Sequence, residues 1–522
     1  MGVRSSAVPH QPPIVLGAGG VAAVDVISVA RQERAVVLGA DARVAIERGS
    51  AVVEQLVDSP APVYGVSTGF GALANTVIPA QRSAELQTAL IRSHAAGMGG
   101  EVEREVVRAM MLLRARSLAM GFSGARVHVV EAILALLGAG LTPVVREHGS
   151  LGASGDLAPL ASAALVLLGE GEARRRDGTL IDGVTACGEA GFEPLTLRAK
   201  EGLALINGTD GMLGMLVLAL ADLELLLATA DIAGAISTEA LLGTDQAFAA
   251  DLVAMRPQLG QAVSAANLRA LLHGSAIVAS HRHGDDRVQD AYSLRCTPQV
   301  HGAARDTIEH ARAVAGRELL SFIDNPVVLP DGRVESCGNF HGAPVAAVAD
   351  FLAISIADVG AISERRTDRL LDRTRSNGLP PFLTPDAGVN SGLMIAQYAQ
   401  AAMVAENRRL AVPASTDTLP TSAMQEDHVS LGWSATRKLR VAVANLARIL
   451  AVELLAGSFG LALRAPLTPA AATGAIADSV RAVAGGPGPD EWLAPRLAAV
   501  EQLVLAGAIR AAADSALTNP LS

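Results

Sequence analysis

Apolar residues recur at helical spacing along most of the chain. From residue 82 to 138 they follow a spacing of three to four, as in Leu86, Leu90 and Ile91, which predicts amphipathic helices. Beyond Lys200 the apolar runs lengthen, and they predict helices over roughly 200–241, 263–279, 299–320, 341–371, 391–410 and 430–463. Helices of this length exceed the globular average and commonly pair between subunits. We therefore expect a mostly α fold, with an N-terminal domain over residues 1–205 and a long-helix bundle over residues 206–522.

The composition agrees with a helical core and narrows the choice of partners. Of the 522 residues, 50% are hydrophobic but only 3% are aromatic, so Ala, Leu and Val must fill the core, as in closely packed helices. The formal net charge of -10 argues against a nucleic-acid partner, because phosphates call for a basic face.

The most hydrophobic region, residues 212–236, is the place to look for a membrane span. Asp222, Glu224 and Asp231 interrupt it, so no uncharged run reaches the length that a span needs. The first 13 residues lack the apolar core of a signal peptide. The three cysteines lie far apart, which fits a reducing compartment better than a disulfide framework. We expect a buried helix in a cytoplasmic protein with no membrane partner.

The chain has only two lysines, Lys200 and Lys438, and they bear on cofactor chemistry. Neither has the setting of a Walker loop. Both are flanked by charged residues in stretches that we expect to be exposed and helical, unlike a Schiff-base lysine. His281 and His283 have no evident third metal ligand near them. The sequence therefore predicts no metal and no nucleotide or pyridoxal cofactor.

The run Gly152-Ala153-Ser154-Gly155-Asp156 carries unusual chemical potential. With so little side-chain bulk, the amide nitrogen of Gly155 can approach the carbonyl carbon of Ala153 without a Cβ in the way. Ring closure and dehydration would give an imidazolone with an exocyclic methylidene, an electrophile that no standard side chain provides. The alternative is an ordinary turn in which Asp156 caps the next helix.

Polar motifs elsewhere suggest a pocket around such an electrophile. Tyr64 leads the glycine-rich stretch 65–71, which predicts a mobile loop rather than a helix, and a tyrosine there is either a packing residue or a base. His94 is either a packed core histidine or a residue that faces a cavity, because the glycines after it predict a helix end. Four further motifs, each of which is otherwise a cap or an interhelical contact, interrupt the aliphatic pattern at residues 205–209, 288–296, 338–341 and 422–430.

These motifs together resemble the aromatic amino acid ammonia-lyases and the related aminomutases, along nearly the whole chain. The resemblance rests on residues 64–71, on Gly152-Ala153-Ser154-Gly155-Asp156-Leu157-Ala158-Pro159 and on Asn207-Gly208-Thr209. It implies a fumarase/aspartase-like fold and a homotetramer whose pockets are assembled from several subunits. It also implies that Ala153, Ser154 and Gly155 form 4-methylideneimidazol-5-one (MIO) without an external cofactor.

The resemblance also implies roles for single residues. Tyr64 is the candidate base, and Arg295 matches the position that grips the substrate carboxylate. Four positions match residues that line the pocket: Asn207, Gln289, Tyr292 and Phe340. His94 and Glu426 match positions that face the substrate ring.

Two places indicate the substrate within this family. Ser93-His94 and Gln425-Glu426-Asp427-His428 resemble the branch that acts on histidine, and the general run of the sequence resembles its actinobacterial members. A carboxylate at position 426 can accept the N–H of an imidazole, which a phenyl ring does not offer. The expected reaction is deamination of L-histidine to trans-urocanate and ammonia. The alternatives are a lyase or 2,3-aminomutase acting on tyrosine or phenylalanine, and a non-catalytic helical scaffold.

Overall fold

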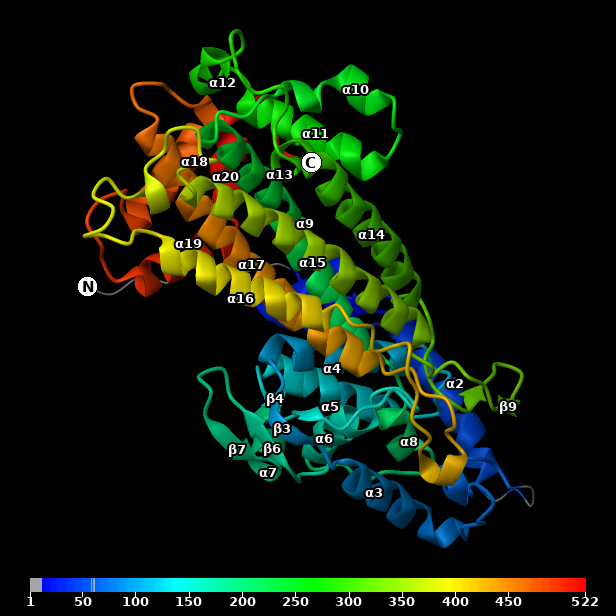
Figure 1. Cartoon of the computed structure of the whole chain (residues 1–522). Coiled ribbons are helices and arrows are strands. Elements are labelled where there is room, and N and C mark those ends of the chain that lie inside the picture. Colours follow the sequence, from blue (N-terminus) through cyan, green and yellow to red (C-terminus); the bar gives the residue numbers. More distant parts are fainter. Residues whose placement is uncertain (1–11, 58, 60–61) are drawn as a thin grey trace. The chain divides into compact units, whose positions relative to one another are not determined.

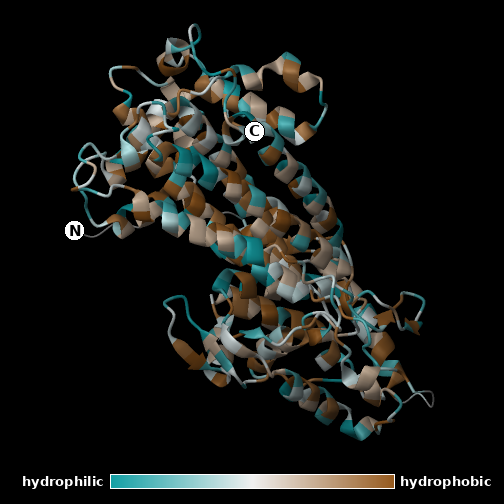
Figure 2. Ribbon diagram, in the orientation of Figure 1, coloured by the Kyte–Doolittle hydropathy of each residue, from teal (hydrophilic) through white to brown (hydrophobic). Residues whose placement is uncertain are grey.

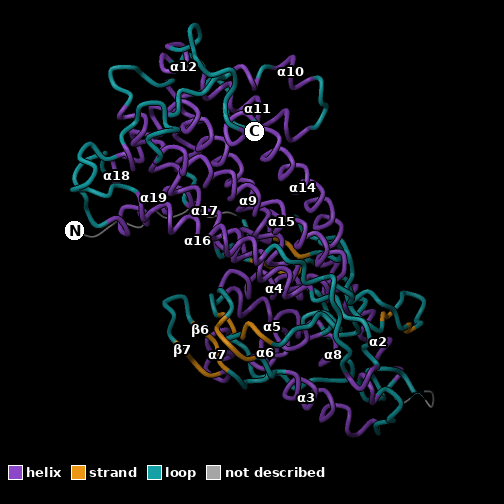
Figure 3. Tube along the Cα trace, viewed as in Figure 1, coloured by secondary structure: helices purple, strands orange, loops and turns teal. Residues whose placement is uncertain are grey.

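The computed structural model describes residues 12–57, 59 and 62–522, and its elements are mainly helices. Strands in these residues are four residues long at most and form small sheets of two or three strands (Figure 3). The expectation of a mostly α fold is thereby confirmed. The chain forms two compact units, with unit 1 containing residues up to Leu218 together with 312–349 and 414–437, and unit 2 containing 219–311, 350–413 and 438–522.

Unit 1 holds most of the short elements. Its helices and 3₁₀ turns are α1 (Ala23–Gln32), α2 (Ala40–Leu56), η1 (Gly71–Leu73), η2 (Ala80–Arg82), α3 (Ser83–His94), α4 (Arg104–Ala119), α5 (Val127–Gly138), α6 (Leu157–Leu167), α7 (Gly183–Ala190), α8 (Glu201–Ile206) and η5 (Ser422–Met424). Its strands are β1 (Ile14–Leu16), β2 (Val36–Leu38), β3 (Met98–Glu101), β4 (Thr142–Pro143), β5 (Arg146–His148), β6 (Glu172–Arg174), β7 (Leu180–Asp182), β8 (Val327–Val328) and β9 (Val334–Glu335). β1 pairs with β2 in parallel. The other pairs are antiparallel: β3 with β5, β4 with β6, β6 with β7, and β8 with β9.

The core of unit 1 forms around α4, which is buried over nearly its whole length. It packs against α1 and α5. Helices α3, α6 and α8, labelled in Figure 1, pack against one another. Alanine and leucine are frequent in α5 and α6, and Figure 2 shows hydrophobic segments in this part of the chain. The hairpin of β6 and β7 turns at Gly178, as its Asp-Gly sequence predicts. α6, which follows the Ala153-Ser154-Gly155 turn, thus packs against α3 and α8.

Four long helices contribute residues to both units: α9 (Asp210–Ala240), α14 (Thr297–Glu318), α15 (Ala343–Leu371) and α17 (Gly432–Leu463). Unit 2 also contains η3 (Gln246–Phe248), α10 (Ala250–Ala254), α11 (Leu259–Leu272), α12 (Ala276–Ser280), α13 (Tyr292–Arg295), η4 (Pro381–Leu383), α16 (Met394–Leu410), α18 (Ala471–Ala484), α19 (Leu493–Leu505) and α20 (Ala508–Ala516). Within unit 2, α18 packs against α19, α20 and α11.

The long helices match the sequence expectation except at two breaks. The expected helix over 200–241 is divided at Asn207-Gly208-Thr209, and the one over 263–279 is divided where Gly274 adopts a φ of 77°. The boundary near residue 205 stays a prediction about where the chain divides. Packing adds that two later segments, 312–349 and 414–437, belong with unit 1.

Three of the long helices are long and apolar enough to cross a membrane by length and composition alone. Their most apolar stretches have mean hydropathies of 2.0 in α9, 2.0 in α15 and 1.8 in α17. Of these stretches, 78%, 61% and 83% respectively are buried inside the protein. Such burial is typical of helices that pack on other helices of their own chain. The sequence-based expectation that none of these helices spans a membrane stays a prediction.

Candidate active site

The Ala153-Ser154-Gly155 turn lies directly before α6 and is held against the break between α8 and α9. Gly155 has a φ of 74°, and a Cβ at this position would lie 2.0 Å from the carbonyl oxygen of Gly208. The next amide, that of Asp156, donates to the same oxygen at 2.7 Å. Only glycine satisfies both the left-handed backbone and this close approach. The turn is therefore a built feature rather than a loose connection.

Asp156 directly follows the turn and connects it to the start of α9. Its carboxylate is fully buried, accepts a hydrogen bond from the Ser150 hydroxyl at 3.0 Å and accepts another from the backbone N–H of Met212 at 2.9 Å, in the first turn of α9. Burial raises the pKa of Asp156 to about 7, because a carboxylate loses its hydration there. Its carboxylate thus binds the start of α9 rather than capping α6, as the turn-and-cap alternative had it.

Ser154 is half-buried, and its hydroxyl donates to Oδ1 of Asn207 at 2.6 Å. The amide nitrogen of Asn207 donates to Oδ1 of Asp324 at 2.9 Å and to the carbonyl oxygen of Asn325 at 2.8 Å. Both acceptors lack hydrogens, so they determine which way the Asn207 amide faces. The hydroxyl of Ser154 therefore faces the amide oxygen of Asn207 and not its amide nitrogen.

Lys200 corrects an expectation from the sequence. Its side chain is fully buried, its Nζ lies 2.8 Å from Oδ2 of Asp324, and Asp324 is fully buried as well. Its backbone is left-handed, with a φ of 70°, and it lies just before α8 rather than in an exposed helix. Lys438 is in a helix, as expected, but is largely buried and forms an ion pair with Asp350 at 2.5 Å. The prediction that both lysines are exposed was wrong, because charged neighbours in the sequence do not determine which side chain points inward.

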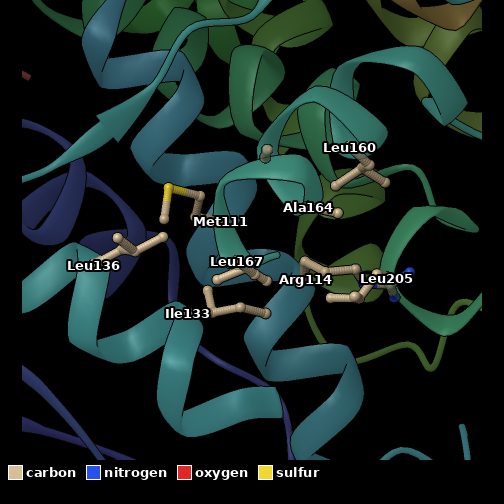
Figure 4. A pocket seen from close by; sticks show the side chains of 9 residues that line it. Met111, Arg114, Ile133, Leu136, Leu160, Ala164, Leu167 and Leu205 are labelled. Carbon is tan, nitrogen blue, oxygen red and sulfur yellow. The ribbon is translucent and has the colours of Figure 1, made fainter. Parts of the chain in front are cut away.

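Arg114, on α4, supports the backbone of Asn207. Its Nη1 donates to the carbonyl oxygen of Asn207 at 2.7 Å and its Nη2 to that of Ile323 at 2.8 Å. Its side chain borders a cavity of about 20 Å³ among aliphatic side chains, including Leu160 and Leu205 (Figure 4). That volume holds about one water molecule. This cavity is too small for a substrate. The role of Arg114 is to bind the backbone of the segment between α8 and α9.

Tyr64 directly precedes the glycine-rich stretch, in which residues 65–69 are buried. Its hydroxyl accepts a hydrogen bond from the backbone N–H of Gly71 at 3.3 Å, and its ring packs edge-on against Phe70 at 6.3 Å. Burial raises the pKa of the Tyr64 phenol, the Gly71 N–H lowers it, and the charges of Glu426 and Asp324 raise it further. Within unit 1 the phenol is therefore held neutral at neutral pH.

Two cavities of about 570 Å³ each share Tyr64, Gly71, Ser154 and Glu426 in their walls. The first, here the Phe340 cavity, is also lined by Ala153, Asn325, Cys337, Phe340 and Gln425. The second, here the His94 cavity, is also lined by Phe70, Leu90, Ser93, His94, Leu157 and Ile206. Both volumes suffice for an amino acid. Ser154 thus borders both spaces, and every predicted site residue of unit 1 lines one of them or contacts Ser154.

Glu426 is presented by a strained segment. Ser422, Ala423 and Met424 all have left-handed backbones, with φ of 48°, 51° and 71°, a conformation that costs about 1–2 kcal/mol per residue. The Thr421 hydroxyl donates to Oε2 of Glu426 at 2.7 Å, and the two residues also pair through their backbones. These bonds hold the carboxylate toward the cavities.

His94 is the last residue of α3, as the glycines after it predict. Its Nδ1 lies 2.9 Å from the carbonyl oxygen of Leu90 and 3.0 Å from Oγ of Ser93. Burial lowers the pKa of His94, against the opposing effects of the Leu90 carbonyl and the Glu426 charge. A neutral ring that donates from Nδ1 to Leu90 leaves Nε2 as an acceptor.

The other three predicted site residues belong to unit 2. Gln289 lines a separate polar cavity of about 160 Å³, and Tyr292 and Arg295 begin and end α13. Tyr292 is 72% exposed, and the guanidinium of Arg295 lies 4.5 Å from the centre of its ring. Nε of Arg295 is buried and has no hydrogen-bond partner among the described residues. Their inclusion in the site stays a prediction.

Sequence reasoning missed Lys200, Asp324 and Thr421 as supports of the site. The scarcity of lysine was a usable signal for Lys200, because a lone lysine before an apolar helix is conspicuous in this composition. Nothing in the sequence around Asp324 or Thr421 singles them out. Across residues 12–57, 59 and 62–522, no group of three or more His, Cys, Asp or Glu side chains could hold a metal ion, and His281 instead contacts Asp285 at 3.1 Å.

The chain is similar to known proteins of one family along nearly its whole length. The family model for aromatic amino acid lyases matches residues 21–482. The histidine ammonia-lyases of Streptomyces avermitilis and Streptomyces griseus are 58% identical over 510 residues and 59% identical over 512, covering 98% of this chain and 99% of each relative.

Solved structures show the same fold. The histidine ammonia-lyase of Trypanosoma cruzi superposes with a TM-score of 0.89 at 37% identity, covering 97% of this chain and 96% of that one. The tyrosine aminomutase of Streptomyces globisporus superposes with a TM-score of 0.91 at 35% identity, covering 98% of this chain and all of that one. The fumarase/aspartase-like fold class expected from the sequence is thereby confirmed. The chain belongs to the aromatic amino acid lyase family.

Proposed function

We propose that the protein is a carbon–nitrogen lyase that converts L-histidine to trans-urocanate and ammonia. The observation that carries this proposal is the sharing of one cavity by Ser154, Glu426 and His94. Ser154 is the source of the electrophile, and the other two supply a carboxylate and a neutral imidazole for a polar substrate ring. The identity of 58% to a histidine ammonia-lyase over nearly the full length supports this choice of substrate.

The residues of the turn fit the MIO group. Gly155 has the left-handed backbone and the glycine-only clearance that ring closure onto Ala153 calls for, and the Ser154 side chain borders both cavities. Once formed, the group supplies an electrophile that makes the amine of the substrate a better leaving group. Ala153 and Gly155 hold it, and Asn207 faces it at the Ser154 position.

Glu426 and His94 bind the imidazole ring of the substrate. Thr421 occupies Oε2 of Glu426, so Oε1 is the oxygen that accepts a ring N–H. Nε2 of His94 accepts the other ring N–H when the substrate ring is protonated. Leu90 and the Phe70 ring exclude water on the apolar side of the same cavity.

Tyr64 removes the proton from the β-carbon of the substrate. Its hydroxyl must first lose its own proton, and the Gly71 N–H favours the anion. Further donors or positive charge in the assembled pocket must add to this effect. Arg295 grips the substrate carboxylate through its fork of donors.

The working protein is a homotetramer in this proposal. Gln289, Tyr292 and Arg295 come to the pocket from other copies of the chain, as the family resemblance implies. The exposed ring of Tyr292 and the unpartnered Nε of Arg295 support a surface that another copy or the substrate covers.

Incubation of purified protein with L-histidine tests the proposal directly. Urocanate, followed by its ultraviolet absorption, and one equivalent of ammonia are expected. Parallel incubations with L-tyrosine and L-phenylalanine are expected to stay inactive by comparison. A β-amino acid product would instead identify an aminomutase, a reading favoured by the similarity to the Streptomyces globisporus enzyme. Absence of any reaction together with an intact mass that retains both waters would identify a scaffold.

A further inference from the structure

We propose that the buried ion pair of Lys200 and Asp324 positions Asn207 for the maturation of the Ala153-Ser154-Gly155 turn. This inference rests on the proposed function, because it concerns how the electrophile forms. Neither Lys200 nor Asp324 lines one of the two cavities or forms a hydrogen bond with the Ala153-Ser154-Gly155 turn among the described residues. It acts through Asn207, and its residues are positioning residues rather than catalytic ones.

The hydrogen bonds form one continuous chain from Lys200 to Ser154. Nζ of Lys200 lies 2.8 Å from Oδ2 of Asp324, whose Oδ1 accepts from the amide of Asn207 at 2.9 Å. Oδ1 of Asn207 then accepts the Ser154 hydroxyl at 2.6 Å. Each bond in such a chain polarises the next one. The negative charge on Asp324 therefore strengthens the carbonyl of Asn207 as an acceptor for Ser154.

Asp324 also determines the orientation of Asn207. A carboxylate accepts hydrogen bonds and donates none, so only the amide nitrogen of Asn207 can face it. Lys200 lies against the other oxygen of this carboxylate, in a site that is fully closed to solvent, and so fixes the position of the acceptor that Asn207 faces.

Stability alone gives a poor account of the pair. Burying two charges costs their hydration, and apolar side chains of similar volume usually do as well or better. Lys200 is also held on a left-handed backbone, which adds strain. Lys438, by contrast, retains some exposure and donates to a backbone carbonyl, that of Leu410, at 2.8 Å.

The hydrogen bond from Ser154 belongs to the precursor, because it exists only while Ser154 keeps its hydroxyl. Maturation forms a bond between N of Gly155 and the carbonyl carbon of Ala153. The carbonyl oxygen takes the Gly155 amide proton and leaves as water with the Ser154 amide proton, which gives a C=N bond. The Cα hydrogen and the hydroxyl of Ser154 leave as a second water, which gives the exocyclic C=C bond. No oxidant or reductant is needed.

The test uses intact mass during cell-free synthesis of the full chain, so that loss of two waters is followed in time without substrate. Asp324→Asn keeps the shape of the side chain, and the double variant Lys200→Met with Asp324→Asn leaves no unpaired buried charge. The matched control is Lys438→Met, which removes the only other lysine and its ion pair. Circular dichroism and thermal unfolding report the fold of each variant.

We expect Asp324→Asn and the double variant to fold and to lose the two waters roughly tenfold to a hundredfold more slowly, the range for one charge-assisted hydrogen bond. Lys438→Met should mature as the wild type does. Maturation of both variants at the wild-type rate would overturn the inference and leave the proposed function intact. Failure of both variants to fold would also overturn it, because the pair would then serve the fold itself. A wild-type chain that retained both waters would refute the proposed prosthetic group.

Discussion

The phenol oxygen of Tyr64 accepts a hydrogen bond from the backbone N–H of Gly71 at 3.3 Å, in a setting that otherwise opposes the phenolate. Burial and the nearby carboxylates of Glu426 and Asp324 raise the pKa of the phenol, against the effect of this donor. A base in this position works only in its deprotonated form.

Tyr64→Phe should therefore lower kcat for histidine by roughly 10²–10⁴. Because the phenol is mostly protonated at neutral pH, kcat of the wild type should increase as pH rises toward the phenol pKa, and this dependence should vanish in the variant. Rates measured from pH 6 to 10 check it. Tyr398→Phe, on an exposed tyrosine of α16, is the control, and an unchanged pH profile in Tyr64→Phe would contradict the assignment of the base.

Ser154→Ala removes the hydroxyl that maturation must lose. We expect no detectable urocanate, an intact mass without loss of water, and a small loss of stability of about 1 kcal/mol from the missing bond to Asn207. Ser162→Ala removes a comparable hydroxyl that bonds only to a helical carbonyl, that of Ala158, and should remain active. Activity of the Ser154→Ala protein near the wild-type level would rule out the proposed prosthetic group.

Gly155→Ala tests the close contact with Gly208. The new Cβ would lie 2.0 Å from the Gly208 oxygen, so the turn must shift in addition to bearing a left-handed alanine. Gly178→Ala is the matched control, because its φ of 85° carries the same backbone cost but no atom lies within 4 Å of the new Cβ.

We expect Gly178→Ala to lose about 1–2 kcal/mol and Gly155→Ala to lose clearly more, with no maturation by intact mass. Thermal unfolding and mass spectrometry measure both. Equal stability of the two variants would show that the turn has more room than its contacts indicate.

Glu426→Gln keeps the acceptor for Thr421 but removes the charge beside the substrate ring. We expect kcat/KM for histidine to fall roughly 10²-fold or more, with maturation unaffected. Glu189→Gln, in a surface ion pair with Arg175, serves as the control for loss of one carboxylate. A variant that turned over histidine as fast as the wild type would remove Glu426 from the ring site.

Asp156 predicts a pH dependence of stability. Its pKa in the folded protein is about 7, above the ordinary value of 3.8, so the folded state binds a proton that the unfolded state has already lost. Its contribution to stability is complete below about pH 4 and is lost as pH rises to about 7. The amount is on the order of 4 kcal/mol.

Asp156→Asn stays neutral throughout this range. Its melting temperature relative to the wild type should therefore increase between pH 4 and pH 8. A difference that was constant with pH would contradict a protonated Asp156 in the folded protein.

Local pattern was enough to predict much of this structure. The helices over 299–320, 341–371 and 430–463 follow from apolar spacing, because a helix needs only its own residues to show one apolar face. The end of α3 at His94 follows from the glycines after it in the same way, whereas Asp156 precedes α6 without capping it. The breaks at residues 207–209 and 273–275 escaped prediction because the apolar pattern continues on both sides of them.

The supports of the site could not be predicted in this way. Asn207 and Asp324 are 117 residues apart, and Lys200 and Asp324 are 124 apart. Whether a lysine points inward depends on the partner that chain folding brings to it. The flanking Ala199 and Glu201 are both buried as well, so the charge of Glu201 was a false sign of exposure.

The sequence by itself determined the helical fold, the family and the Ala153-Ser154-Gly155 turn, since these depend on local spacing and on a contiguous motif. Only the tertiary structure decided that Asn207 faces Ser154 with its oxygen, that Lys200 is buried against Asp324, and that Glu426 and His94 share a cavity with Ser154. The physical reason is that burial and hydrogen-bond partners arise from contacts between distant segments, which no local pattern encodes.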